Sequence, residues 1–204
     1  MRILAIETAS EACSVALFEG DVLLDRRHET IGRGHAERLI PMIAELPDRG
    51  KADEIRVSLG PGSFTGTRIG LAAARALGIA WGARVRGYPT LALVAAVARA
   101  ERGAIAVDVA MTGGHGEYYV QPFGPDGLPA TPHASLPPAE AAALSAATVI
   151  AGTRASQLAE ARGSGDALEI WPDAALALAL PDALLIEELS PIYGRPPDAK
   201  LPGQ

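Results

Sequence analysis

Short apolar runs separated by turn signals mark most of the first hundred residues. They predict a strand over residues 2–9, a hairpin over 13–29 that turns at residues 19–21, and another strand over 54–60. Between them, apolar residues recur every three or four positions over 34–49, which is the spacing of an amphipathic helix. An alanine-rich helix is expected over 91–102, after a turn at 84–90.

The stretch GPGSFTGTRIGLAAARALG, residues 60–78, predicts a turn followed by a helix. Pro61 makes the turn, and Ser63 or Thr65 can cap the helix by accepting hydrogen bonds from free backbone N–H groups. Small residues recur every fourth position along one ridge of this helix: Gly62, Gly66, Gly70, Ala74 and Gly78. An interior glycine costs a helix roughly 0.5–1 kcal/mol relative to alanine, so close packing must offset that loss. The packing partner is either inside the domain or on another chain.

The second half repeats the order of elements. Strands are expected over 104–111, 117–127 and 148–152, with helices over 135–146, 153–162 and 171–185. Each half opens with a strand that feeds a hairpin, which is a weak internal symmetry. We therefore divide the chain into residues 1–102 and 103–204, and expect little order in the tail 194–204.

Composition narrows the function. Of 204 residues, 49% are hydrophobic, enough for one large or two small cores. The net charge of −6 and the 4% of aromatic residues argue against independent nucleic-acid binding, although RNA contact inside a complex stays open. The single cysteine, Cys13, excludes a disulfide framework, and no apolar run approaches the roughly 18 residues of a membrane span.

Familiar catalytic and nucleotide motifs are missing. The glycine stretch lacks the lysine of a phosphate-binding P-loop and the spacing of a dinucleotide-binding loop. No histidine pair has zinc-ligand spacing, and His35 is expected to face solvent or cap its helix. Cys13 lies among alternating apolar residues, which indicates a buried strand cysteine, and no G-x-S-x-G nucleophile motif occurs.

Four segments together resemble the TsaB family, also called YeaZ. They are RILAIETASEACSVAL at the N-terminus, HAERLIPMI at 35–43, GPGSFTGTRIGL at 60–71 and PIYGR at 191–195. The match covers about half of the chain and is patchy beyond Gly103. It implies an α/β, actin-like ATPase (ASKHA, ribonuclease H-like) fold of two related subdomains, the second of them trimmed.

The resemblance also implies a role without catalysis. TsaB is a bacterial cytoplasmic subunit in the synthesis of N6-threonylcarbamoyladenosine at position 37 of tRNAs that read ANN codons. It binds TsaD, the metal-containing transferase, through N-terminal helices, and the ATPase TsaE joins them. Self-association is possible, tRNA is met only within the complex, and no cofactor is expected. The expected interface residues are His35, Leu39, Met42, Gly62, Gly66, Arg68, Gly70 and Ala74.

The turn after the first strand and the segment 108–114 can each be interpreted in two ways. Glu7, Thr8 and Ser10 form either a phosphate loop or a polar turn, and the family has aspartate where Glu7 stands. Residues 108–114 form either a second acid–glycine loop or a hairpin turn. The family's DAR-x-x-E-V-Y hairpin is altered here between Asp108 and Glu117.

Two further choices stay open. Arg68 either pairs with an acid of a partner or is a solvated arginine, and Tyr193 with Arg195 either latches the C-terminus or reaches the partner. A stand-alone actin-like ATPase or kinase, and a metal-dependent peptidase, are the competing functions. The first would require nucleotide binding by the isolated chain, and the second a bound metal.

Overall fold

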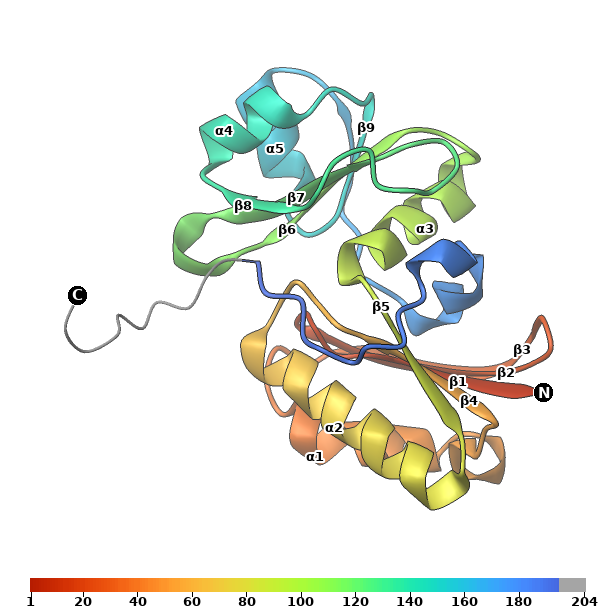
Figure 1. The fold of residues 1–204 in the computed structure, drawn as a ribbon. Coiled ribbons are helices and arrows are strands. Elements are labelled where there is room, and N and C mark those ends of the chain that lie inside the picture. The colour runs from red at the N-terminus through yellow and green to blue at the C-terminus, as the bar shows by residue number, and fades with distance from the viewer. Residues whose placement is uncertain (195–204) are drawn as a thin grey trace.

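A computed structural model describes residues 1–194, which form two five-stranded sheets, one above the other in Figure 1. In the first sheet the strand order is β3-β2-β1-β4-β5, with β1 and β2 antiparallel and β1, β4 and β5 parallel. Its strands are β1 (Arg2–Glu7), β2 (Ala12–Glu19), β3 (Val22–Thr30), β4 (Glu54–Ser58) and β5 (Arg84–Tyr88).

The second sheet repeats this topology in the order β8-β7-β6-β9-β10, read from its antiparallel edge. Its strands are β6 (Val107–Thr112), β7 (Tyr118–Phe123), β8 (Ala134–Leu136), β9 (Val149–Ala151) and β10 (Asp166–Leu168). The internal symmetry expected from the sequence is therefore present, and the outer strands of the second sheet are reduced to three residues each.

Helices separate and cover the two sheets as layers (Figure 1). Helices α1 and α2 cover the outer face of the first sheet, α3 lies between the sheets, and α4 and α5 cover the second. Their bounds are α1 (His35–Ala44), α2 (Phe64–Trp81), α3 (Thr90–Arg102), α4 (Pro138–Leu144) and α5 (Ala155–Arg162). No helix in residues 1–194 has both the length and the apolar character to cross a bilayer.

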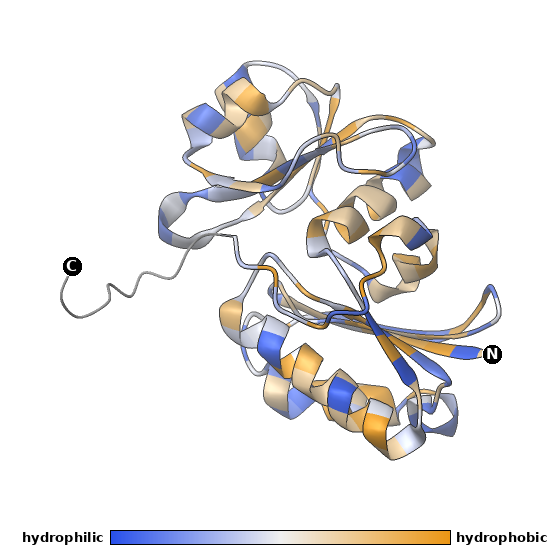
Figure 2. Cartoon of the chain, viewed as in Figure 1, coloured by the Kyte–Doolittle hydropathy of each residue, from blue (hydrophilic) through white to orange (hydrophobic). Residues whose placement is uncertain are grey.

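The buried side chains form three hydrophobic cores. Side chains along β1 point alternately into two of them. Leu4 and Ile6 point into the core beneath α1 and α2, whereas Ile3 and Ala5 point into the central core around α3. The cartoon coloured by hydropathy shows apolar residues on the central strands and on the helices that cover them (Figure 2). Helix α3 is buried along most of its length, which explains why most of its residues are small or apolar.

Two predicted elements are wrong. Residues 84–90 contain β5, not only a turn. This edge strand begins with exposed and half-buried positions that carry arginines, so no apolar run marks it. Residues 171–185 do not form a helix broken at Pro181. They form two short 3₁₀ segments, η3 (Ala174–Ala179) and η4 (Asp182–Leu184), because Pro172 and Pro181 confine the first of them.

The segment after β10 returns to the first sheet. The backbone of Ala177 accepts a hydrogen bond from Arg56 on β4, and Ile186 forms a β-bridge with Gly87 on β5. Further along, the N–H of Ile192 donates to the carbonyl of Leu59 at 2.7 Å. A division of the chain at residue 102 therefore leaves a C-terminal segment that contacts the sheet of the N-terminal half.

Candidate interaction site

Helix α2 begins where the sequence predicts. The Ser63 hydroxyl accepts a hydrogen bond from the N–H of Gly66 at 3.1 Å, which caps the first turn. The helix runs for 18 residues and ends at Gly82, whose φ of 67° is the left-handed conformation that glycine adopts most easily. Capping and termination thus fix the helix that carries the glycine ridge.

The glycine ridge faces inward, so its close-packing partner lies inside the domain. A β-carbon on Gly66 would lie 2.0 Å from the carbonyl oxygen of Thr8, and one on Gly70 would lie 2.3 Å from the Thr8 hydroxyl. A β-carbon on Gly62 would meet the carbonyl of Ala9 at 2.0 Å. Ala74 is fully buried in the same layer. The ridge lets α2 approach the end of β1, so leucine at Gly66 or Gly70 would not leave the fold intact.

Three expected contact residues of α1 are also buried. Leu39 and Met42 belong to the core beneath the helix, and His35 is buried with its Nε2 3.2 Å from the carbonyl of Ala12. His35 therefore neither faces solvent nor caps α1 through its side chain, because the first sheet covers it. Of the expected interface set, Arg68 is exposed, Gly62 is partly exposed and the other six residues are buried.

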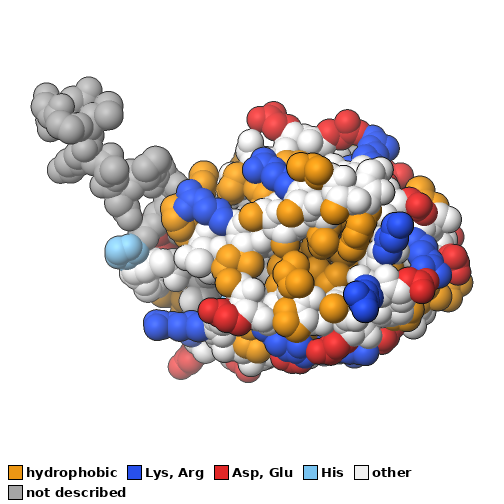
Figure 3. All heavy atoms as spheres, turned by 90° about the horizontal axis from the view of Figure 1, so that it is seen from below, with side chains coloured by type: hydrophobic (Ala, Val, Ile, Leu, Met, Phe, Trp, Pro, Cys, Tyr) orange, Lys and Arg blue, Asp and Glu red, His pale blue; other side chains and the backbone are white. Residues whose placement is uncertain are grey.

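The outer faces of α1 and α2 carry apolar side chains that sequence reasoning missed. Ile79 on α2 is 87% exposed, and Ile40 on α1 is also exposed. Ala72 and Ala76 extend the apolar stripe along α2. Figure 3, which views the molecule from the side of these two helices, shows apolar side chains gathered there with charged residues around them. We call the exposed residues Ile40, Ala72, Ala76 and Ile79 the outer helical face.

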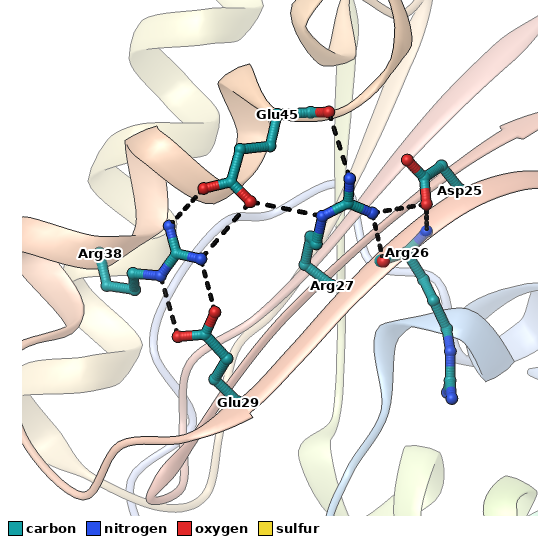
Figure 4. A network of polar contacts seen from close by, with 6 residues as sticks. All are labelled: Asp25, Arg26, Arg27, Glu29, Arg38 and Glu45. Carbon is teal, nitrogen blue, oxygen red and sulfur yellow. Dashed lines mark hydrogen bonds and ion pairs between the residues drawn. The ribbon is translucent and has the colours of Figure 1, made fainter.

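An ion-pair network holds α1 against β3 (Figure 4). The guanidinium of Arg38 donates to both oxygens of Glu29 on β3, at 2.9 and 2.5 Å, and to Glu45 just after α1, at 2.7 Å. Arg27 extends the network by joining Glu45 to Asp25. Hydrogen bonds from Arg38 lower the pKa of Glu29 and of Glu45, so both acids are charged at neutral pH. The network fixes one of the two helices of the outer helical face.

Arg68 and Tyr193 meet at the start of α2. The Arg68 guanidinium donates to the Tyr193 hydroxyl at 2.7 Å and lies 3.3 Å from the ring centre of Phe64. Tyr193 therefore latches the end of the described chain onto α2, and its half-exposed side chain stays within reach of a partner. Arg195 lies outside the described residues.

A cleft of about 390 Å³ opens between the two sheets. Ser10, Gly62 and Ser63 line it from the first half of the chain, and Thr112 and Gly113 from the second. Glu7 and Thr8 are fully buried and are not among its lining residues. Of the three phosphate-loop candidates, Ser10 is the one that reaches this cleft.

Glu7 lies beneath the turn at the end of β1. Its Oε1 accepts a hydrogen bond from the N–H of Ala9 at 2.6 Å, while Oε2 has no partner among the described residues. The neighbouring Ser58 hydroxyl forms a hydrogen bond with the Thr90 hydroxyl at 2.5 Å. Burial raises the pKa of the Glu7 carboxyl to about 7, and the bond from Ala9 offsets only part of that effect. One oxygen of the Glu7 carboxyl is thus committed to the turn that follows β1.

Asp108 is committed to local structure. Its Oδ2 accepts hydrogen bonds from the Ser145 hydroxyl and from the N–H groups of Ala146 and Ala147, each at 2.7 Å. This position is beside α4 and not among the residues that line the cleft. Residues 108–114 thus do not place their acid as a nucleotide loop would, and the hairpin interpretation holds.

A metal site and a reactive thiol place different requirements on the described residues. No group of three or more His, Cys, Asp or Glu side chains in residues 1–194 is arranged to hold a metal ion. Cys13 is buried, and burial followed by the nearby charge of Glu29 raises the pKa of its thiol to about 11. The thiol is therefore protonated at neutral pH and a poor nucleophile.

Comparisons of sequence match the chain to a TsaD family model and to proteins named TsaB. A family model described as "TsaD: tRNA N6-adenosine threonylcarbamoyltransferase" matches residues 28–162. The tRNA threonylcarbamoyladenosine biosynthesis protein TsaB of Escherichia coli is 39% identical over 124 residues, 58% of this chain and 53% of that protein. Its counterpart in Haemophilus influenzae is 39% identical over 101 residues, 47% of this chain and 41% of that protein. The chain thus spans about half the length of these curated relatives.

Solved structures match over nearly the whole chain. A protein from Pseudomonas aeruginosa described as similar to peptidase YeaZ has a TM-score of 0.78 at 30% identity, over 95% of this chain and 99% of that one. The ethanolamine utilization protein EutJ of Carboxydothermus hydrogenoformans reaches a TM-score of 0.52 at 11% identity, over 88% of this chain and 89% of that one, which shows the fold alone. The actin-like α/β fold expected from the sequence is confirmed.

Proposed function

The chain belongs to the TsaB (YeaZ) family of tRNA threonylcarbamoyladenosine biosynthesis, and from that membership we propose that it is a non-catalytic subunit that binds and activates TsaD. The observation that carries the proposal is the outer helical face. Its apolar side chains are exposed on two helices whose inner faces are fixed by the core and by the glycine ridge. A rigid, apolar, helical surface is suited to packing against helices of another subunit.

Family membership also underlies the proposed roles of TsaE and tRNA and the proposed location of the complex. TsaE joins the pair, tRNA is met only within the complex, and the complex works in the cytoplasm. An acidic chain of net charge −6 gains little from RNA phosphates by itself, so the basic partner surfaces must supply that affinity. Self-association through the same face is the expected competitor of TsaD binding.

Reconstitution tests the proposed function. TsaD and TsaE from the same organism would be supplied with tRNA and the threonylcarbamoyl donor, with and without this chain, and modified adenosine would be measured by mass spectrometry of digested tRNA. We expect modification to depend on the chain, and the chain alone to produce none. Modification by the chain alone, or full activity in its absence, would contradict the proposal.

One observation favours a second candidate, nucleotide binding by the isolated chain. The cleft of about 390 Å³ is lined by hydroxyls and glycines from both sheets, including Ser10, Thr112 and Gly113. Calorimetric titration of the isolated chain with ATP, compared with a Ser10→Asp variant, separates the two functions. Binding that the variant loses would favour the ATPase, and no heat in either titration would favour the accessory subunit.

A further inference from the structure

Arg68 is held in one orientation at the surface. Its guanidinium carbon lies 3.3 Å from the ring centre of Phe64 and 5.6 Å from that of Tyr193, and the two rings are 6.0 Å apart. The Tyr193 hydroxyl accepts one hydrogen bond from Nη2 at 2.7 Å. An arginine that lies over one aromatic ring and is hydrogen-bonded to the hydroxyl of a second loses less conformational entropy when it forms further bonds, because its plane is already fixed.

This guanidinium retains unused hydrogen-bond donors. A guanidinium carries five N–H donors, and within residues 1–194 Arg68 uses one of them, in a bond to a neutral hydroxyl. Within residues 1–194 Arg68 forms no salt bridge, whereas Arg38 and Arg27 are paired with carboxylates. Phe64 and Tyr193 remain exposed, at 60% and 50%, so the cluster is open to an incoming side chain.

Helix α2 has an unusual charge pattern for this chain. The protein contains 24 acidic residues, yet none lies between Phe64 and Trp81, where the two charged residues are Arg68 and Arg75. Arg75 is bonded to the backbone carbonyl of Leu189 at 2.5 Å. Arg68 is thus an exposed cation on an apolar helix surface without acids, in a molecule of net charge −6, and it complements an apolar surface that carries an acid.

We propose that Arg68 is a preformed receptor for a carboxylate of the protein subunit that packs on the outer helical face. An aspartate or glutamate side chain would accept two parallel N–H bonds from the guanidinium and so fix the register of that subunit along α2. The inference rests on the proposed function and adds to it the chemistry of one contact. An RNA phosphate is the less favoured occupant, because the net charge of the chain repels a polyanion and the adjoining surface is apolar.

The test measures the affinity of the full chain for purified TsaD by isothermal titration calorimetry. We expect Arg68→Gln to weaken binding at least tenfold, and Arg68→Glu to weaken it further, because a second negative charge would face the carboxylate. Arg68→Lys should recover only part of the affinity, since an ammonium cannot form the paired bonds. The matched control is Arg75→Gln, which removes the same charge from the same helix and should change affinity less than threefold.

A Tyr193→Phe variant separates the carboxylate contact from the latch. It removes the hydroxyl that holds Arg68 but leaves the guanidinium, so we expect a loss of less than threefold. A loss as large as that of Arg68→Gln would show that the latch, not the charge, matters, and would overturn the proposal. Equal affinities of Arg68→Gln and Arg75→Gln would overturn it as well.

The binding results distinguish a failure of the carboxylate receptor from a failure of the proposed function. Failure of the unaltered chain to bind TsaD refutes the proposed function itself. Tight binding by the unaltered chain and by Arg68→Gln alike refutes only the carboxylate receptor. If Arg68→Gln binds TsaD normally but the complex no longer retains tRNA in a filter-binding assay, the occupant is an RNA phosphate and the proposal is wrong. Melting temperatures of all variants establish that the fold is kept.

Discussion

Glu7, at the end of β1, is a fully buried acid whose pKa is raised by that burial. Its buried carboxyl has one oxygen bonded to a backbone N–H and one without a partner among the described residues. A pKa of about 7 means that folding takes up a proton between the ordinary value near 4.5 and neutrality. The native state is therefore favoured below that window and loses stability as pH rises through it.

A Glu7→Gln variant should reveal this cost. The amide keeps the size of the side chain but does not titrate, so the variant should gain stability over the unaltered chain as pH rises from 5 to 8. The shift corresponds to roughly 3 kcal/mol at most, and relaxation around the charge will reduce it. Urea unfolding at both pH values measures the difference. A stability difference between the two proteins that does not change with pH would contradict the assigned pKa.

For single residues, the sequence predicted contacts with neighbouring residues well, but it predicted poorly which side chains are exposed to solvent. The Ser63 cap and the buried Cys13 follow from neighbouring residues, and both are present. His35 was expected at the surface because a polar residue at a helix start is usually solvated. It is buried because β2 passes over it and supplies the Ala12 carbonyl, a contact between residues 23 positions apart.

The two faces of helix α2 have different roles: the inner face packs against the fold, and the outer face is the one proposed to bind a partner. Its inner face carries glycines that let it approach β1, and its outer face carries Ala72, Ala76 and Ile79. Sequence reasoning identified the spacing of the glycines and the need for a close neighbour, but left open where that neighbour lies. The neighbour is the turn after β1.

Two matched substitutions on α2 test the inward packing. At Gly66 a β-carbon would meet the backbone carbonyl of Thr8 at 2.0 Å, which cannot move without shifting β1. At Gly78 it would meet a methyl group of Val85 at 2.5 Å, which a side-chain adjustment can relieve. We expect Gly66→Ala to lose about 2–3 kcal/mol of unfolding free energy. Gly78→Ala should stay within about 1 kcal/mol, because better helix propensity offsets the strain.

Chemical denaturation of both glycine variants gives the comparison. Each protein carries the same added methyl group on the same helix, so differences in helix propensity cancel. Equal losses, or a more stable Gly66→Ala protein, would contradict the packing of α2 against β1.

The sequence did not predict the strands that lack a clear pattern of apolar residues. Strand β5 begins with arginines, and β8 and β10 have three residues each, too few for alternation to be recognised. They form because a neighbouring strand supplies their hydrogen bonds, which is long-range information. The segment 171–185 has the composition of a helix, but its prolines and its place between the sheets favour two short turns.

For the whole molecule, the repeated topology follows from the repeated order of elements, and it is the part of the fold that the sequence predicted best. The C-terminal segment is what the sequence could not place. Its contacts with Gly87, Leu59 and Arg68 join residues about 100 or more positions apart. The same segment borders the helix on which the proposed partner docks, so fold and recognition meet there.

The central claim is that the outer helical face binds the partner, and one pair of variants tests it most directly. Ile79→Asp places a charge on that face, and Val22→Asp places the same charge on β3, where Val22 is 64% exposed. Size-exclusion chromatography with light scattering would be run on each variant mixed with TsaD. The account predicts a complex with Val22→Asp, as with the unaltered chain, and none with Ile79→Asp. A stable complex with Ile79→Asp would contradict it.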